Sequence, residues 1–283
     1  MLSENPFFQK KISRRDFLGI AGLTVLSLAF RPRYFETPTP ETWHLSLPEQ
    51  LEILANPKTF TELQGKNTRK IITNQLDDNE YLEKEVPNHN NTCGSAVVTT
   101  IIKLCEYLNT GVVPDNTIGS TYKILKKSTF NNQWGLVPIL DQGGFIDNNG
   151  IGDAIKLLNP DLVSKTEYFT SLPPVIISES QWPDILSKAQ TICESGGIIT
   201  IGTILHGSTH IIIATNVKKD GSATIIDSFD GTATIIGPYK SNFPQEKTLK
   251  EYIQPLWINR NDNKEYVGGL WAVIGISRKQ NTI

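Results

Sequence analysis

The second half of the chain contains a series of short apolar segments that are rich in Ile, Val and Thr. Side chains branched at Cβ favour strands, and turn sequences such as Lys219-Asp220-Gly221 and Asp230-Gly231 separate the segments. The pattern predicts strands at residues 198–205, 210–217, 223–227, 232–236 and 270–276. Because short turns join antiparallel neighbours, we expect a meander-like antiparallel sheet in the C-terminal half.

Helical patterns precede most of this sheet along the chain. Between residues 92 and 108, apolar side chains recur at three- and four-residue spacing, which predicts a buried helix with Thr92 as a suitable N-cap. The run of β-branched residues at 97–102 by itself favours a strand, but the length of the segment and the spacing of its apolar side chains favour a helix. Further helices are expected at 151–158 and 182–193. Helices first and an antiparallel sheet afterwards predict the α+β class.

Composition limits the function classes. With 39% hydrophobic and 20% charged residues among 283, the chain has enough apolar side chains for a packed core. The net charge of −2 and the lack of a basic run beyond the N-terminus give no reason to expect nucleic acid as a partner. Three cysteines are too few for a disulfide framework, and we expect Cys105 and Cys193 to be ordinary buried side chains.

The N-terminus has the features of a targeting segment. The run Ser13-Arg14-Arg15-Asp16-Phe17-Leu18 resembles the twin-arginine export signal S-R-R-x-F-L, and an uncharged stretch at 17–30 follows it. That stretch is shorter than a typical membrane span, and Ser27-Leu28-Ala29 offers a cleavage site. The resemblance implies export of the folded protein by the twin-arginine machinery to the periplasm, cell surface or medium. The alternative is an uncleaved anchor, and either form would contact the membrane only through this segment.

The sequence predicts three parts. Residues 1–30 form the signal or anchor, and residues 31–84 form a linker and N-terminal extension, since four prolines lie between 32 and 48 and the rest is polar. We expect short helical pieces and little order there. Residues 85–283 form the folded domain.

Three residues of the folded domain suggest nucleophilic chemistry. Cys93 stands at the predicted helix start, where unpaired backbone N–H groups can hold an oxyanion and where thiols are acidified. His210 opens one predicted strand and Asp227 closes the next, so a hairpin would place both at the same end of the sheet. This predicts Cys93 as nucleophile, His210 as base and Asp227 as the group that orients the imidazole. Asp230 is the alternative orienting group and His89 the alternative base.

A metal site is not expected. His206 and His210 are four residues apart, but the segment is not helical and Gly207 follows His206 where zinc proteases have Glu. No glycine-rich phosphate loop is present either, and the proposed chemistry needs no cofactor.

The three motifs together resemble the peptidase C39-like branch of the papain-fold cysteine peptidases. Thr92-Cys93-Gly94-Ser95-Ala96 looks like that family's D-C-G-P-A, and Asp227-Ser228-Phe229-Asp230-Gly231 is similar to its D-P-x-x-G. The stretch from 196 to 213 resembles its strand, glycine-containing loop, His and apolar strand. Over residues 85–280 the resemblance implies a papain-like fold, in which an N-terminal catalytic helix packs on a C-terminal antiparallel sheet. It also implies a peptide or protein substrate, with Cys93 as nucleophile, His210 as general base and acid, and Asp227 as orienter.

The chain departs from the family pattern before the cysteine. The family carries a Gln about six residues before Cys, whose amide helps to hold the oxyanion, whereas position 87 here is Pro. Asn88 is the nearest side-chain amide to that position, and we expect it to act as the donor. Two other functions remain open: a cell-wall amidase of the same Cys/His type, and an inactive papain-like domain that binds peptide or glycan at the cell surface.

Overall fold

A computed structural model of the chain describes residues 45–56, 71–76, 92–127, 148–169, 176–205, 208–237, 247–254, 256–258, 265–267 and 270–278. The chain divides into two units, Met1–Thr42 and Trp43–Ile283, and every described residue belongs to the second. The predicted signal at 1–30 therefore lies outside the described residues. Within the described parts, no helix has the length and apolar character needed to cross a membrane.

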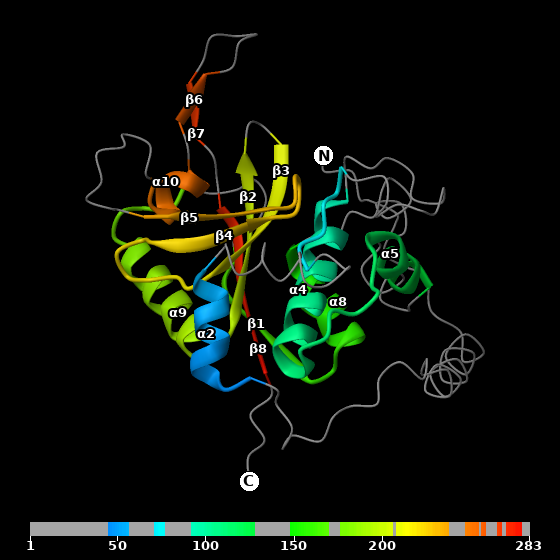
Figure 1. Ribbon diagram of the computed structural model, residues 1–283. Helices are drawn as coiled ribbons and strands as arrows, with labels where there is room; N and C mark the ends of the chain where they lie inside the picture. The colour runs from blue at the N-terminus through cyan, green and yellow to red at the C-terminus, as the bar shows by residue number, and fades with distance from the viewer. Residues whose placement is uncertain are drawn as a thin grey trace, which may run out of the picture. The chain divides into compact units, whose positions relative to one another are not determined.

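An antiparallel sheet of six strands forms the centre of the second unit, in the order β1-β8-β2-β3-β4-β5 (Figure 1). Strands β2 to β5 follow one another along the chain and form the predicted meander, whereas β8 returns to lie between β1 and β2. Two shorter strands, β6 and β7, pair separately. The strands are β1 Leu162–Phe169, β2 Ile198–Leu205, β3 Ser208–Thr215, β4 Ala223–Asp227, β5 Thr232–Ile236, β6 Leu256–Ile258, β7 Glu265–Val267 and β8 Leu270–Arg278.

Helices lie on both faces of this sheet. Helix α4 contacts β3 and also packs against α5 and α8, whereas α9 and α10 contact β2. In Figure 1 the sheet lies between α9 and α4. The described helices are α2 Leu47–Ala55, α4 Cys93–Thr110, α5 Ile118–Lys127, α8 Asn148–Leu158, α9 Trp182–Glu194 and α10 Leu249–Ile253. The protein is thus a mixture of helices and an antiparallel sheet, which confirms the predicted α+β class.

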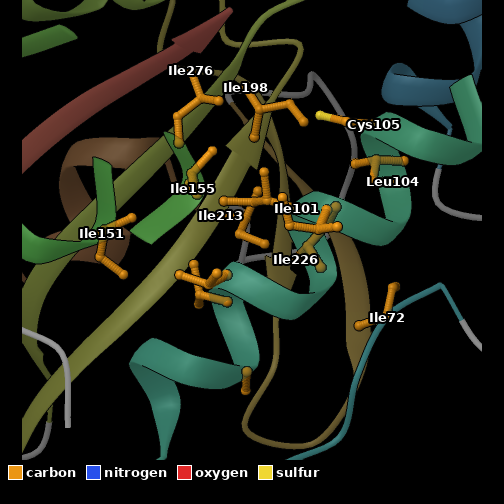
Figure 2. Packing of buried hydrophobic residues seen from close by; sticks show 14 of the residues in the cluster. Ile72, Ile101, Leu104, Cys105, Ile151, Ile155, Ile198, Ile213, Ile226 and Ile276 are labelled. Carbon is orange, nitrogen blue, oxygen red and sulfur yellow. The ribbon is translucent and has the colours of Figure 1, made fainter. Parts of the chain in front are cut away.

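The alternation of side chains along the strands produces two hydrophobic clusters. In β3, Ile211 and Ile213 belong to the cluster around α4, whereas Ile212 and Ala214 belong to the cluster around α9. Successive side chains of a strand point to opposite faces, so a run of consecutive apolar residues serves both layers. Figure 2 shows the first cluster, in which Ile213 of β3 lies with Ile101 of α4 and other buried residues.

Helix α4 is buried on nearly all sides, which explains its apolar and β-branched composition. Its buried residues include every position from Cys93 to Cys105. A helix that is buried all round is a core element rather than a surface helix, and its buried polar side chains include Thr99 and Thr100. The helix ends at Thr110, and the C-cap Gly111 has a positive φ of 71° that is accessible to glycine and donates its N–H to Tyr107 O. Thr92 stands at the N-cap position, but its side chain makes no capping bond to the described first turn.

Part of the segment that we expected to be a linker and extension belongs to the core. Helix α2 contacts β4, and the hydroxyls of Thr215 and Thr224 donate to the carbonyls of Leu54 and Ala55 at 2.6 and 3.0 Å. These bonds satisfy carbonyls that a helix end leaves without an intrahelical partner. Residue Ile71 is also fully buried. Within the predicted linker and extension at 31–84, the described residues Leu54, Ile71 and Ile72 thus belong to the hydrophobic cluster around α4.

Strand β3 is offset by two residues from the predicted 210–217. It begins at Ser208 and ends at Thr215, because Asn216 adopts a positive φ of 50° that no regular strand accepts. Asn tolerates this left-handed region better than most residues.

Candidate active site

Helix α4 carries Cys93 as its first residue, as the sequence predicts. The thiol is 5% exposed, and the first intrahelical bond runs from the N–H of Ala96 to the carbonyl of Thr92. The backbone N–H groups of Cys93 and Gly94 belong to the first turn of the helix, where N–H groups have no intrahelical acceptor. A thiol at this position lies beside backbone donors and the positive end of the helix dipole.

Strands β3 and β4 bring His210 and Asp227 together. The two strands pair antiparallel, with Ile213 opposite Ile226, so the start of β3 and the end of β4 lie at the same end of the sheet. His210 Nε2 donates to Asp227 Oδ1 at 2.8 Å. The same oxygen accepts the N–H of Phe229 at 2.8 Å, which holds the carboxylate in one orientation.

Cys93 is the second group that interacts with the His210 ring. Its side chain acts on the His210 ring and helps to raise the pKa of the imidazole, although more than a hundred residues separate the two in the sequence. Because Nε2 is bonded to Asp227, Nδ1 is the ring nitrogen left for the thiol. The helix and the two strands thus bring a thiol, an imidazole and a carboxylate into one site.

This environment favours the protonated imidazole. Burial by itself lowers the pKa of His210, but the hydrogen bonds to Asp227 and Cys93, together with the negative charges of these groups, outweigh burial and raise the pKa to about 9. A pKa above neutrality favours the imidazolium, which can donate a proton to Asp227 Oδ1.

Two aromatic residues, Phe229 and Tyr252, interact with members of this pair. The Phe229 ring stands perpendicular to the His210 ring, with centroids 6.1 Å apart, and the Phe229 side chain is 45% exposed. Tyr252 of α10 lies within the field of Asp227 and Asp230, and burial together with these charges raises its pKa to about 12. The phenol therefore stays protonated at neutral pH.

The alternative orienting residue, Asp230, has a different partner. Its Oδ1 accepts the N–H and the hydroxyl of Thr232 at 3.1 and 2.6 Å, so it shapes the turn between β4 and β5. Asn88, the expected oxyanion donor, lies outside the described residues, and so do His89 and His206.

A second amide, Gln75, was missed by the sequence reasoning. It is 1% exposed, and its backbone N–H donates at 2.8 Å to the carbonyl of Ser228, the residue after Asp227. Two residues earlier, the hydroxyl of Thr73 donates to the carbonyl of Ala96 in α4. Residues 73–75 thus run from the first turns of the Cys93 helix to the Asp227 turn. The sequence signal for Gln75 is weak, because it is a single Gln that follows the apolar pair Ile71 and Ile72 and lies far from Cys93 along the chain.

The other two cysteines are core residues. Cys105 and Cys193 are buried, and all three cysteines of the chain are described and free of disulfides. Burial raises the pKa of Cys193 to about 11, against hydrogen bonds from the backbone of Val217 and Asn216 that lower it. That thiol is therefore protonated at neutral pH, which confirms the expectation that it is an ordinary buried residue.

The described residues contain no group of three or more His, Cys, Asp or Glu side chains that could hold a metal ion. The chemistry that the site offers is that of a nucleophile paired with a proton donor and acceptor. No protein-family model matches the chain, and no curated protein shows significant similarity to it.

Proposed function

We propose that the protein is an exported cysteine hydrolase that cleaves a peptide or isopeptide bond through Cys93, His210 and Asp227. The observation that carries the proposal is the 2.8 Å bond between His210 and Asp227, together with the effect of the Cys93 side chain on the same imidazole ring. Nucleophile, base and orienting group in this order are the requirement for activating a thiol. A papain-like arrangement, with α4 as catalytic helix on the antiparallel sheet, is part of the same proposal.

In the first half-reaction, the ionised Cys93 sulfur attacks the carbonyl carbon, and a C–S bond forms while the carbonyl oxygen takes up the negative charge. The C–N bond then breaks as the His210 imidazolium transfers the proton facing the sulfur to the leaving amine. The products of this step are a free amine and a thioester on Cys93. Asp227 keeps its hydrogen bond to Nε2 and so holds the ring in place.

In the second half-reaction, neutral His210 removes a proton from water, and the hydroxide adds to the thioester carbon. The C–S bond breaks, the acid product leaves, and the sulfur returns to its ionised form opposite a protonated ring. The cycle needs no cofactor, since one residue supplies and recovers the proton.

The oxyanion needs donors, and the backbone N–H of Cys93 is one. The second donor is a side-chain amide, for which the chain offers Asn88, close in sequence, and Gln75, buried beside the Asp227 turn. Losing one such donor costs roughly a hundred- to a thousandfold in rate. We expect one of the two variants, Asn88→Ala or Gln75→Ala, to show this loss of rate while Cys93 is still alkylated. A variant that cleaves substrate at the normal rate shows that the replaced residue is not the oxyanion donor.

The function is tested by incubating the purified protein with a library of peptides and branched isopeptides and analysing the products by mass spectrometry. The expected result is cleavage that disappears in Cys93→Ala and persists in Cys105→Ala, the matched control on the same helix. Retention of full cleavage by Cys93→Ala would contradict the proposal. If Cys93 is alkylated selectively but no peptide is cleaved by any preparation, a domain that binds peptide or glycan without turnover becomes the better account.

A further inference from the structure

Three buried hydroxyl groups connect the helix of Cys93 with the turn of Asp227. They belong to Thr100 of α4, to Thr73 in the 71–76 segment and to Ser228 after β4, and each residue is 0% exposed. The Thr100 and Thr73 oxygens are 2.8 Å apart, and those of Thr100 and Ser228 are 3.2 Å apart. The backbone N–H of Thr73 also donates to the Thr100 oxygen at 3.1 Å.

The direction of these bonds follows from one proton per hydroxyl. Thr73 gives its proton to the carbonyl of Ala96 at 2.9 Å, so the bond between the two threonine oxygens uses the proton of Thr100. The bond between Thr100 and Ser228 then uses the proton of Ser228. The Thr100 oxygen therefore accepts two hydrogen bonds and donates one, which makes it the centre of the network.

The network ends next to the candidate site on both sides. Ser228 follows Asp227 directly, and its carbonyl is held by the N–H of Gln75 at 2.8 Å. Thr100 lies two turns after Cys93 on a helix whose core-facing side chains are fully buried. Hydrogen bonds in such a water-free environment hold their groups firmly, because an unpaired buried polar group is costly.

We propose that Thr100 is a positioning residue that fixes the Asp227 turn relative to the helix of Cys93, and so sets the alignment of Asp227 with His210. The proposal rests on the proposed function of that site. The hydroxyl touches none of the reacting groups and acts through Ser228. Without it, the turn loses its side-chain attachment to α4, and the 2.8 Å bond between His210 and Asp227 is free to lengthen.

The test measures the pKa of His210 by NMR of ¹⁵N-labelled histidine in the full chain, a readout that requires no substrate. The chain has four histidines, so the His210 resonance is assignable by comparison with His210→Gln. The titratable groups that act on the ring are Asp227 from β4 and Cys93 from α4, with Asp230 and Tyr252 near the carboxylate. Weaker coupling to Asp227 lowers the pKa of His210.

Four variants separate positioning from stability. We expect Thr100→Val, which keeps the shape and removes the hydroxyl, to lower the pKa of His210 by about one unit from its value of about 9. Ser228→Ala should lower it in the same direction with less disturbance, since the Thr73 N–H keeps its acceptor. Thr100→Ser should restore the native value.

The matched control is Thr99→Val. Thr99 is also fully buried on α4, and its hydroxyl bonds Ser95 O and Thr121 Oγ1 at 2.7 and 2.8 Å, away from the Asp227 turn. It should lower the melting temperature without moving the pKa of His210. An unchanged pKa in Ser228→Ala and Thr100→Val, or an equal fall in Thr99→Val, would overturn the proposal. If the proposed function fails, the wild-type protein cleaves no peptide; if the positioning role of Thr100 fails, the pKa of His210 does not respond to the variants. The two failures are therefore distinguishable.

Discussion

Replacing Asp227 by Asn removes one negative charge from the site and leaves its shape unchanged. An Asn oxygen can still accept the Phe229 N–H, so the turn keeps its internal bond. The His210 ring, however, loses the charged acceptor that contributes most to raising its pKa. The variant therefore isolates the electrostatic contribution of Asp227 from its role in the turn.

The magnitude follows from the pKa of His210. A rise from 6.5 to about 9 corresponds to about 3 kcal/mol of preference for the protonated ring in the folded state. Cys93 supplies part of this, and an opposite charge in contact accounts for roughly one to three pKa units, so we expect Asp227→Asn to destabilise the fold by about 2 kcal/mol where His210 is protonated. Because the folded pKa is the higher one, this stabilisation is fully present below pH 6.5 and is lost as the pH rises through 9.

Urea unfolding followed by tryptophan fluorescence measures the effect at pH 6 and at pH 10. The difference in unfolding free energy between wild type and Asp227→Asn should be about 2 kcal/mol at pH 6 and close to zero at pH 10. Asp230→Asn is the matched control, because its carboxylate lies in the same turn but bonds Thr232, and its effect should not change between these pH values. Equal destabilisation by Asp227→Asn at both pH values would refute the reasoning.

Two further outcomes are expected. Gly197→Ala should destabilise the fold by about 1–3 kcal/mol, which would appear as a lower melting temperature. A Cβ at this position would lie 2.7 Å from Ile192 O and 3.0 Å from Ile276 O, and these backbone oxygens can move aside only at a cost. An unchanged melting temperature would contradict this expectation. Changing Arg14 and Arg15 to Lys should retain the protein in the cytoplasm of the producing cell, measured by fractionation, and unchanged export would exclude the twin-arginine route.

Local chemistry explains why much of the sheet could be predicted. Strands β2, β4 and β5 have their predicted limits because their ends coincide with turns that glycine and aspartate mark, such as Lys219-Asp220-Gly221. Strand β1 was not predicted, since Leu162–Phe169 contains Ser, Lys, Thr and Glu and lacks a continuous apolar run. The insertion of β8 between β1 and β2 depends on pairing between distant segments, which no local pattern encodes.

The candidate site could likewise be predicted from the sequence only in part. Cys93 begins α4 and Asp227 ends β4, as the sequence predicts, and His210 is the third residue of β3, two residues after the strand start. The position of Gln75 and the hydroxyl network of Thr73, Thr100 and Ser228 depend on bonds between segments up to 128 residues apart. A buried threonine with a structural bond has the same sequence signature as an exposed one, so these residues could be found only from the fold.

The most direct test of the account is the rate at which iodoacetamide alkylates each cysteine of the folded protein at pH 6–7, measured by peptide mapping. Cys93 should react at least about tenfold faster than Cys105 and Cys193, and His210→Ala should abolish this advantage, because a neighbouring base activates a nucleophilic thiol. Alkylation of all three cysteines only after denaturation, or the same fast rate at Cys93 in His210→Ala, would contradict the claim that these residues form a nucleophilic site.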